Sequence, residues 1–247
     1  MKALRTLLVG FLSLVPVLPA AAADHAVLDK APIDNKDVSS LQRGAKLFVN
    51  YCLNCHSAAY MRYNRLGDLG LSEEQIKDNL MFASEKVGDQ MVVGMNGKEA
   101  AKWFGAQPPD LSVIARSRGA DWLYTYLRTF YRDETRPTGW NNVTFPNVGM
   151  PHVLWELQGQ QELQHEGGDQ KTEHGAHAAP KLVLAQPGSL GSKEYDAAVA
   201  DLVNYLVFQG EPARAKRVQI GIMTLLFLGI LFIPAYALKK DYWKDVH

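Results

Sequence analysis

The chain has 247 residues with 26 basic and 26 acidic side chains, so its formal net charge is zero. This balance gives no support for nucleic-acid binding, which usually shows as a clustered excess of positive charge. Between two apolar stretches near the ends of the chain, residues 24–214 are numerous enough to form one substantial hydrophobic core.

The first apolar stretch has the organisation of a secretory signal peptide. Lys2 and Arg5 precede a hydrophobic run from Leu7 to Leu18, and Ala20–Ala23 provides small residues for cleavage. A retained membrane anchor is the alternative, but the run is short for a membrane span. We therefore expect residues 1–23 to be removed, which leaves 24 basic and 26 acidic residues and a net charge of −2.

Both cysteines of the chain lie in one pentapeptide, Cys52-Leu-Asn-Cys-His56, whose second cysteine is Cys55. This pattern is typical of c-type haem attachment. On a helix, positions three and four apart share a face, so both thiols can bond to one edge of a porphyrin while the imidazole of His56 reaches the iron. A disulfide is the alternative in an exported protein, but it would close a very small loop and leave His56 unexplained. We expect a covalently bound haem.

Helical periodicity predicts a mainly α domain with long loops around this motif. Ser39 and Gln42 have the spacing of a capping box before the first helix, and Ser72 and Gln75 have it before a second. Gly44 would let the last helix cross the first closely with Tyr205 at the crossing, or it is a merely tolerated helix glycine. The helices expected after the motif cover Leu71–Phe82, Asp121–Tyr131 and Lys193–Phe208.

The composition changes between Gln158 and Pro180, where Gln, Glu, Gly and His dominate. His165, His174 and His177 lie there, but their spacing is irregular and no cysteine accompanies them. We expect a solvated loop rather than a metal site. A short strand is expected directly after it, over Lys181–Ala185.

A haem that carries electrons needs a second axial ligand opposite His56, and a methionine thioether gives a high potential. Met150 lies between Gly149 and Pro151 in an irregular segment, where a rigid loop could present its side chain across the ring. A methionine that only packs is the alternative. The other candidates are Met61, which is close to His56 in sequence, Met81, which we expect in a helix, Met91, Met95 and, as an imidazole, His152.

The second apolar stretch, Val218–Leu238, contains only Gln219 and Thr224 as clearly polar residues. At about 1.5 Å per residue it can cross the roughly 30 Å hydrocarbon core of a bilayer; a buried core helix is the alternative. Basic residues flank both ends, so the positive-inside rule gives no orientation. The signal peptide gives one. We expect residues 24–214 in the periplasm, an anchor at 215–239 and a cytoplasmic tail at 240–247, in a single-pass protein of the inner membrane.

Several ordered motifs resemble those of the cytochrome c1 family, in its proteobacterial form. The haem motif and Ser57 are followed by an Arg-Tyr-Asn-Arg-Leu sequence at 62–66 and by Pro-Pro-Asp-Leu-Ser at 108–112. The segment Phe145–Pro151 is similar to the family's distal-ligand segment, and the anchor after Gly-Glu-Pro at 210–212 also matches. The resemblance covers essentially the whole mature chain.

The resemblance implies a cytochrome c-like haem domain with one C-terminal transmembrane helix, and it implies a set of functional residues. His56 and Met150 would be the iron ligands, and the two cysteines the thioether sites. Residues Pro108–Leu111 would line the haem, Pro109 among them. Arg118 would pair with a haem propionate, with Arg116 as a competitor, and Trp122 would assist it, although the spacing after Arg118 is shorter here than in other members.

By resemblance, the protein is a redox subunit of ubiquinol–cytochrome c oxidoreductase without a bond-making site of its own. It would pass one electron from the Rieske iron–sulfur protein to a cytochrome c, beside the cytochrome b subunit and in contact with membrane lipid. Two alternatives stay open: a stand-alone tethered carrier that delivers electrons to a terminal oxidase, and a haem sensor with an open iron position.

Overall fold

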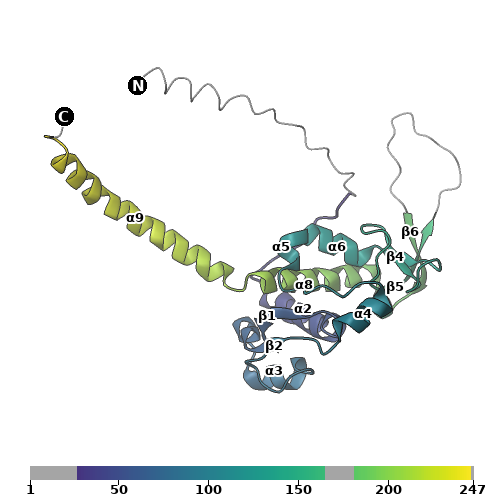
Figure 1. Ribbon diagram of the computed structural model, residues 1–247. Helices are drawn as coiled ribbons and strands as arrows, with labels where there is room; N and C mark the ends of the chain where they lie inside the picture. Colours follow the sequence, from purple (N-terminus) through teal and green to yellow (C-terminus); the bar gives the residue numbers. More distant parts are fainter. Residues whose placement is uncertain (1–26, 165–180, 246–247) are drawn as a thin grey trace, which may run out of the picture.

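A computed structural model describes residues 27–164 and 181–245. It shows a helical domain from which one long helix projects (Figure 1). The predicted signal peptide and the three loop histidines lie outside the described residues. The helices are α2 (Val38–Leu47), a π-helical turn (Phe48–Cys52), a 3₁₀ helix (Tyr63–Leu69), α3 (Glu73–Leu80), α4 (Gly97–Phe104), α5 (Ile114–Arg118), α6 (Ala120–Arg128), α7 (Trp155–Gln158), α8 (Ser192–Gly210) and α9 (Arg214–Tyr242).

The structure confirms one of the two predicted capping boxes. The hydroxyl of Ser72 accepts from the backbone N–H of Gln75 at 3.2 Å, and the Gln75 side chain accepts from the Ser72 N–H at 2.8 Å, so α3 begins where the sequence predicts. The other box is wrong. Asp37 begins α2, because its carboxylate accepts from the Ser40 N–H at 3.0 Å and places Ser39 inside the helix.

Helices α2 and α8 cross in the centre of the domain, as Gly44 predicts. A Cβ at Gly44 would lie only 2.7 Å from the Cβ of Tyr205 and would overlap the backbone carbonyl of Asp201. One turn further along α2, the ring of Phe48 packs on that of Tyr205 with 5.4 Å between centroids, and both side chains are fully buried. The glycine is therefore required by a close helix contact.

Short antiparallel strand pairs join the helices in the described part of the chain. Strand β6 confirms the predicted strand at 181–185 and extends it by two residues, because it pairs along the whole of β5. The other strands were not predicted from the sequence, since most have two or three residues and no visible alternation. The pairs are β1 (Ala58–Arg62) with β2 (Gln90–Met91), β3 (Phe130–Arg132) with β4 (Trp140–Asn142), and β5 (Gly159–Gln164) with β6 (Lys181–Pro187).

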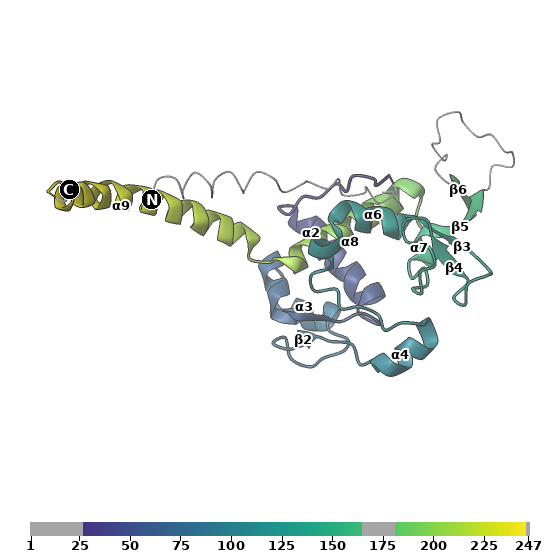
Figure 2. The same ribbon diagram turned by 45° about the horizontal axis from the view of Figure 1, so that its top comes forward.

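Helix α9 leaves the domain directly after α8 and packs against none of it (Figure 2). Its segment Lys216–Tyr242 is long and apolar enough to cross a membrane, and none of the apolar side chains there is buried. An apolar helix in water would bury its side chains, so full exposure disfavours the buried-core alternative. The chain is membrane-anchored by this helix.

Candidate haem site

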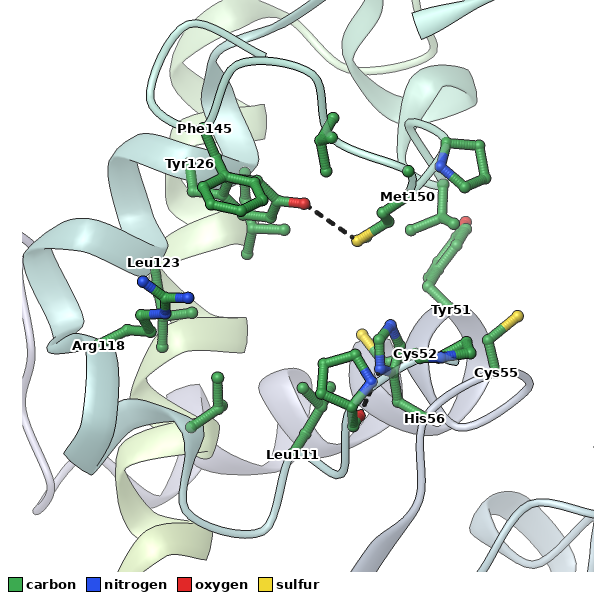
Figure 3. A pocket seen from close by; sticks show the side chains of 18 of the residues that line it. Tyr51, Cys52, Cys55, His56, Leu111, Arg118, Leu123, Tyr126, Phe145 and Met150 are labelled. Atoms are coloured by element: carbon green, nitrogen blue, oxygen red, sulfur yellow. Dashed lines mark hydrogen bonds between the residues drawn. The ribbon is translucent and has the colours of Figure 1, made fainter. Parts of the chain in front are cut away.

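An apolar cavity of about 280 Å³ opens between the Cys-x-x-Cys-His segment and the Met150 loop. Cys52, Cys55 and His56 line one wall, and Met150 lies on the opposite wall (Figure 3). Helix α8 adds Leu202 and Leu206. The remaining lining comes mainly from residues 104–111, from α5 and α6, and from the segment 145–153.

The π-helical turn and the turn after it bring the three residues of the motif to the cavity. The backbone carbonyl of Cys52 accepts from the N–H groups of Cys55 at 3.1 Å and His56 at 2.9 Å, so the pentapeptide is one closed turn. Both cysteines are free thiols. Burial raises the pKa of Cys52 to about 12, which keeps that thiol protonated before any bond is made to it.

The ring of His56 is held by a backbone carbonyl. Its Nδ1 lies 2.7 Å from the carbonyl oxygen of Pro109. A carbonyl can only accept, so Nδ1 carries the proton and Nε2 keeps its lone pair. Burial lowers the pKa of His56, which favours this neutral form. An imidazole that binds a metal through one nitrogen usually donates the N–H of the other nitrogen to such an acceptor.

The carbonyl of Pro109 is fixed in turn by the chain that follows the motif. The carboxylate of Asp110 accepts from the N–H of Ala59 at 2.9 Å, and the N–H of Leu111 donates to the carbonyl of Ser57 at 2.8 Å. Partial burial raises the pKa of Asp110, but its hydrogen bonds with Ser112 and Ala59 outweigh this and lower the pKa overall. The Pro108–Leu111 segment is therefore a strap that orients His56.

Met150 lies in the irregular segment that the sequence predicts. Its Sδ accepts a hydrogen bond from the Tyr126 hydroxyl at 3.3 Å, and its side chain faces the cavity (Figure 3). Gly149 passes close to α4, because a Cβ there would lie 2.5 Å from the carbonyl oxygen of Phe104. Asn147 has a φ of +63°, a left-handed turn that asparagine tolerates.

Two asparagines at the end of β4 hold this loop, and sequence reasoning missed both. The side-chain oxygen of Asn142 accepts from the N–H groups of Thr144 at 2.9 Å and Phe145 at 3.0 Å, while its amide donates to the carbonyl of Tyr126 at 2.8 Å. Asn141 accepts from the N–H of Asn147 at 2.8 Å. Both asparagines are buried, so these bonds fix the loop against α6. An Asn-Asn pair before Phe145 is the only sequence signal for this role.

Arg118 and Trp122 line the cavity on a third side. The guanidinium carbon of Arg118 lies 5.0 Å from the ring centroid of Trp122 and 5.7 Å from that of Phe145, within the range of cation–π contact. Among the described residues Arg118 has no carboxylate partner, whereas its competitor Arg116 does not line the cavity. Arg118 therefore places a positive charge at the edge of the apolar cavity, and no carboxylate of the described residues pairs with it.

The other candidate ligands lie outside the cavity. The core buries three of them, Met61, Met81 and Met91. Met81 lies directly after α3, and the Sδ of Met91 accepts a hydrogen bond from the Tyr205 hydroxyl at 3.8 Å. His152 stacks on Phe130 at 4.8 Å, and burial lowers its pKa to about 4. Met95 does not line the cavity either. Only Met150 among these six faces His56 across the open space.

The residues present fit a covalently attached haem. Two free thiols and an imidazole with an available Nε2 share one wall, and a thioether faces them across apolar lining. This donor set is that of a c-type haem with His and Met ligands. Within the described residues no group of three or more His, Cys, Asp or Glu side chains could hold a metal ion alone.

Comparison with known proteins identifies the family of the chain. The profile of the Cytochrome C1 family matches residues 29–178. A protein of Allochromatium vinosum named "Cytochrome c1" is 50% identical over 248 residues, which cover 98% of this chain and 99% of the relative. A solved chain titled "Hyperthermophilic respiratory Complex III" aligns over 100% of this chain and 97% of its own length, with a TM-score of 0.44 and 16% identity, a likeness too weak to argue from.

A second relative carries a different name. It is 50% identical over 247 residues, covers 100% of both chains, and is named "Ammonia monooxygenase gamma subunit" in Nitrosomonas europaea. That name describes the Nitrosomonas protein.

Fold and site together define a single-haem c-type cytochrome domain on a membrane anchor. The chain belongs to the cytochrome c1 family. It carries a covalently bound haem c and is an electron-transfer subunit of the respiratory cytochrome bc complex.

Proposed function

We propose that Cys52 and Cys55 form the thioether bonds to the haem and that His56 and Met150 are its axial ligands. The observation that carries this proposal is the single cavity with the Cys-x-x-Cys-His turn on one wall and the Met150 thioether on the other. The haem supplies a one-electron redox centre. His56 and Met150 would hold the haem from opposite walls of the cavity, and ligation by two protein side chains would suit electron transfer rather than the binding of small molecules.

The protein residues keep that centre rigid and dry. Pro109 orients His56 through its carbonyl, and the asparagine pair at 141–142 keeps the Met150 loop in place. Arg118, with Trp122 beneath its guanidinium, provides a positive charge for a haem propionate. Pro109, Arg118 and Trp122 therefore complete the proposed haem-binding set.

In this proposal the electron comes from the Rieske iron–sulfur protein and leaves to a cytochrome c. Quinol chemistry belongs to the cytochrome b subunit, whose membrane helices would pack beside α9. The exposed apolar surface of α9 supports such packing, as well as contact with lipid. The haem domain would lie in the periplasm and residues 240–247 in the cytoplasm, after removal of residues 1–23.

The ligand assignment is tested by Met150→Ala in the detergent-purified complex, with Met95→Ala as the matched control because Met95 does not line the cavity. We expect Met150→Ala to lose the weak sulfur-to-iron absorption band of the ferric haem and to bind carbon monoxide when reduced. The control should do neither. A low-spin, high-potential haem that survives Met150→Ala unaltered would rule out the assignment.

The partners are tested by gentle detergent purification and identification of the co-purifying subunits. We expect cytochrome b and a Rieske protein together with this chain. A stand-alone carrier would show the same haem spectrum but purify without them.

A further inference from the structure

The Tyr126 hydroxyl is the polar group that touches the proposed distal ligand. Tyr126 lies on the second turn of α6, and its hydroxyl donates to the Sδ of Met150 at 3.3 Å (Figure 3). A thioether sulfur has two lone pairs, so one can bind the iron while the other accepts this hydrogen bond. No recognised motif of the sequence includes Tyr126.

Two aromatic side chains that pack against the ring of Tyr126 hold its hydroxyl in this position. Tyr126 stacks on Trp122 with 4.8 Å between centroids and 11° between planes, and it meets Phe130 edge-on at 5.0 Å. The side chain is 8% exposed, so solvent does not compete for its proton. Within the described residues the Met150 sulfur is its hydrogen-bond partner.

A hydrogen bond to a ligand sulfur has a defined electronic effect. It withdraws electron density from the sulfur and weakens its donation to iron, and the ferric ion depends on that donation more than the ferrous ion does. The bond therefore favours the reduced haem. Hydrogen bonding to ligand atoms is one of the main ways in which proteins set haem and metal potentials.

We propose that Tyr126 is a positioning residue that raises the reduction potential of the haem and fixes the Met150 thioether on the iron through this hydrogen bond. The inference rests on the proposed axial role of Met150. It adds a residue on α6 that selects the potential without contacting the iron.

The test is Tyr126→Phe in the intact, detergent-purified complex, since phenylalanine keeps the ring stacking and removes only the hydroxyl. Tyr195→Phe is the matched control. Tyr195 is also buried and its hydroxyl donates to the carbonyl of Leu127 at 2.8 Å, but it does not line the cavity. The readouts are the redox titration of the haem, the sulfur-to-iron absorption band of the ferric form, and carbon monoxide binding to the ferrous form.

We expect Tyr126→Phe to shift the oxidation equilibrium toward ferric haem by about 2- to 10-fold, where tenfold corresponds to about 59 mV for one electron. The sulfur-to-iron band should move, and carbon monoxide should bind faster. Tyr195→Phe should leave all three unchanged even where it lowers thermal stability. An unchanged potential and band in Tyr126→Phe, with the band present in the wild type, would overturn the inference alone. Absence of the band from the wild type would overturn the Met150 assignment itself.

Discussion

The crossing of α2 and α8 gives a quantitative prediction for Gly44→Ala. In a helix interior, alanine is normally more favourable than glycine by about 1 kcal/mol. At this position the new methyl group would lie 2.7 Å from the Cβ of Tyr205, against ordinary contact distances of 3.4 Å and more. The two helices would have to separate by at least the difference, 0.7 Å.

Such a separation cannot be absorbed locally. The nearest obstacle is the backbone carbonyl of Asp201, and Tyr205 is fully buried, so neither can turn away. A gap of 0.5–1 Å forfeits roughly a quarter to a half of the dispersion energy along the interface, and overpacking typically costs about 1–3 kcal/mol. Because neither obstacle can move, we take the upper end of that range, about 3 kcal/mol. After the gain of about 1 kcal/mol in helix propensity, we expect Gly44→Ala to destabilise the domain by about 2 kcal/mol.

The measurement is urea unfolding of the full haem-loaded chain in detergent, followed by haem absorbance and far-UV circular dichroism. Gly67→Ala is the control, because a Cβ there would meet nothing within 4 Å and its φ is not positive. The control should unfold within about 0.5 kcal/mol of the wild type. Equal stability of Gly44→Ala and Gly67→Ala would refute the argument from close helix contact.

Three further changes probe the walls of the cavity and the anchoring of the chain around it. Asn142→Ala removes two hydrogen bonds to the Met150 loop, one to the Tyr126 carbonyl of α6 and one to the Thr129 hydroxyl, so we expect a loss of about 2–4 kcal/mol in thermal unfolding and faster carbon monoxide binding to reduced haem. Unchanged carbon monoxide binding would show that the loop does not need these hydrogen bonds. In Gly149→Ala the new Cβ would push the Met150 loop away from the Phe104 carbonyl, so the sulfur-to-iron band should weaken. An unchanged band would show that the close approach of Gly149 to Phe104 does not position Met150. Arg128→Met keeps much of the packing on Tyr124 but removes the ion pairs to Asp29 and Asp196. Because these side chains are partly exposed, we expect the free energy of unfolding to fall by less than about 2 kcal/mol, and a larger fall would contradict this reasoning.

Local sequence rules predicted the parts of the fold that depend on neighbours in the chain. The Ser72–Gln75 box predicted the start of α3, Gly44 offered a close helix crossing as one of two alternatives, and the almost wholly apolar stretch from Val218 indicated the anchor helix. The Ser39–Gln42 prediction was wrong for a local reason as well, because Asp37, two residues earlier, caps the N-terminus of α2 in place of Ser39. Strands β1 to β4 are too short for their alternation to stand out.

Part of the proposed site could also be predicted from neighbouring residues in the sequence, and part could not. The Cys52–His56 pentapeptide is contiguous, so its chemistry is readable from the sequence. Local chemistry alone left six candidates for the second ligand, and the family resemblance pointed to Met150. The tertiary structure adds the position of the cavity, which excludes core residues such as Met91 and His152. Tyr126 carries no recognisable signal in the chain, and Asn142 has only the neighbouring Asn141 as one. Their roles arise from a hydrogen bond across 24 residues and from a short β-hairpin.

By itself, then, the sequence predicted a haem held by two thioethers and one imidazole and a membrane helix near the C-terminus, since covalent spacing and continuous hydropathy are properties of neighbouring residues. Only the tertiary structure decided which thioether faces that imidazole, which arginine stands free at the cavity, and which hydroxyl reaches the sulfur. Those are contacts between residues distant in sequence, and they exist only once α6, α8 and the Met150 loop have closed around one apolar space.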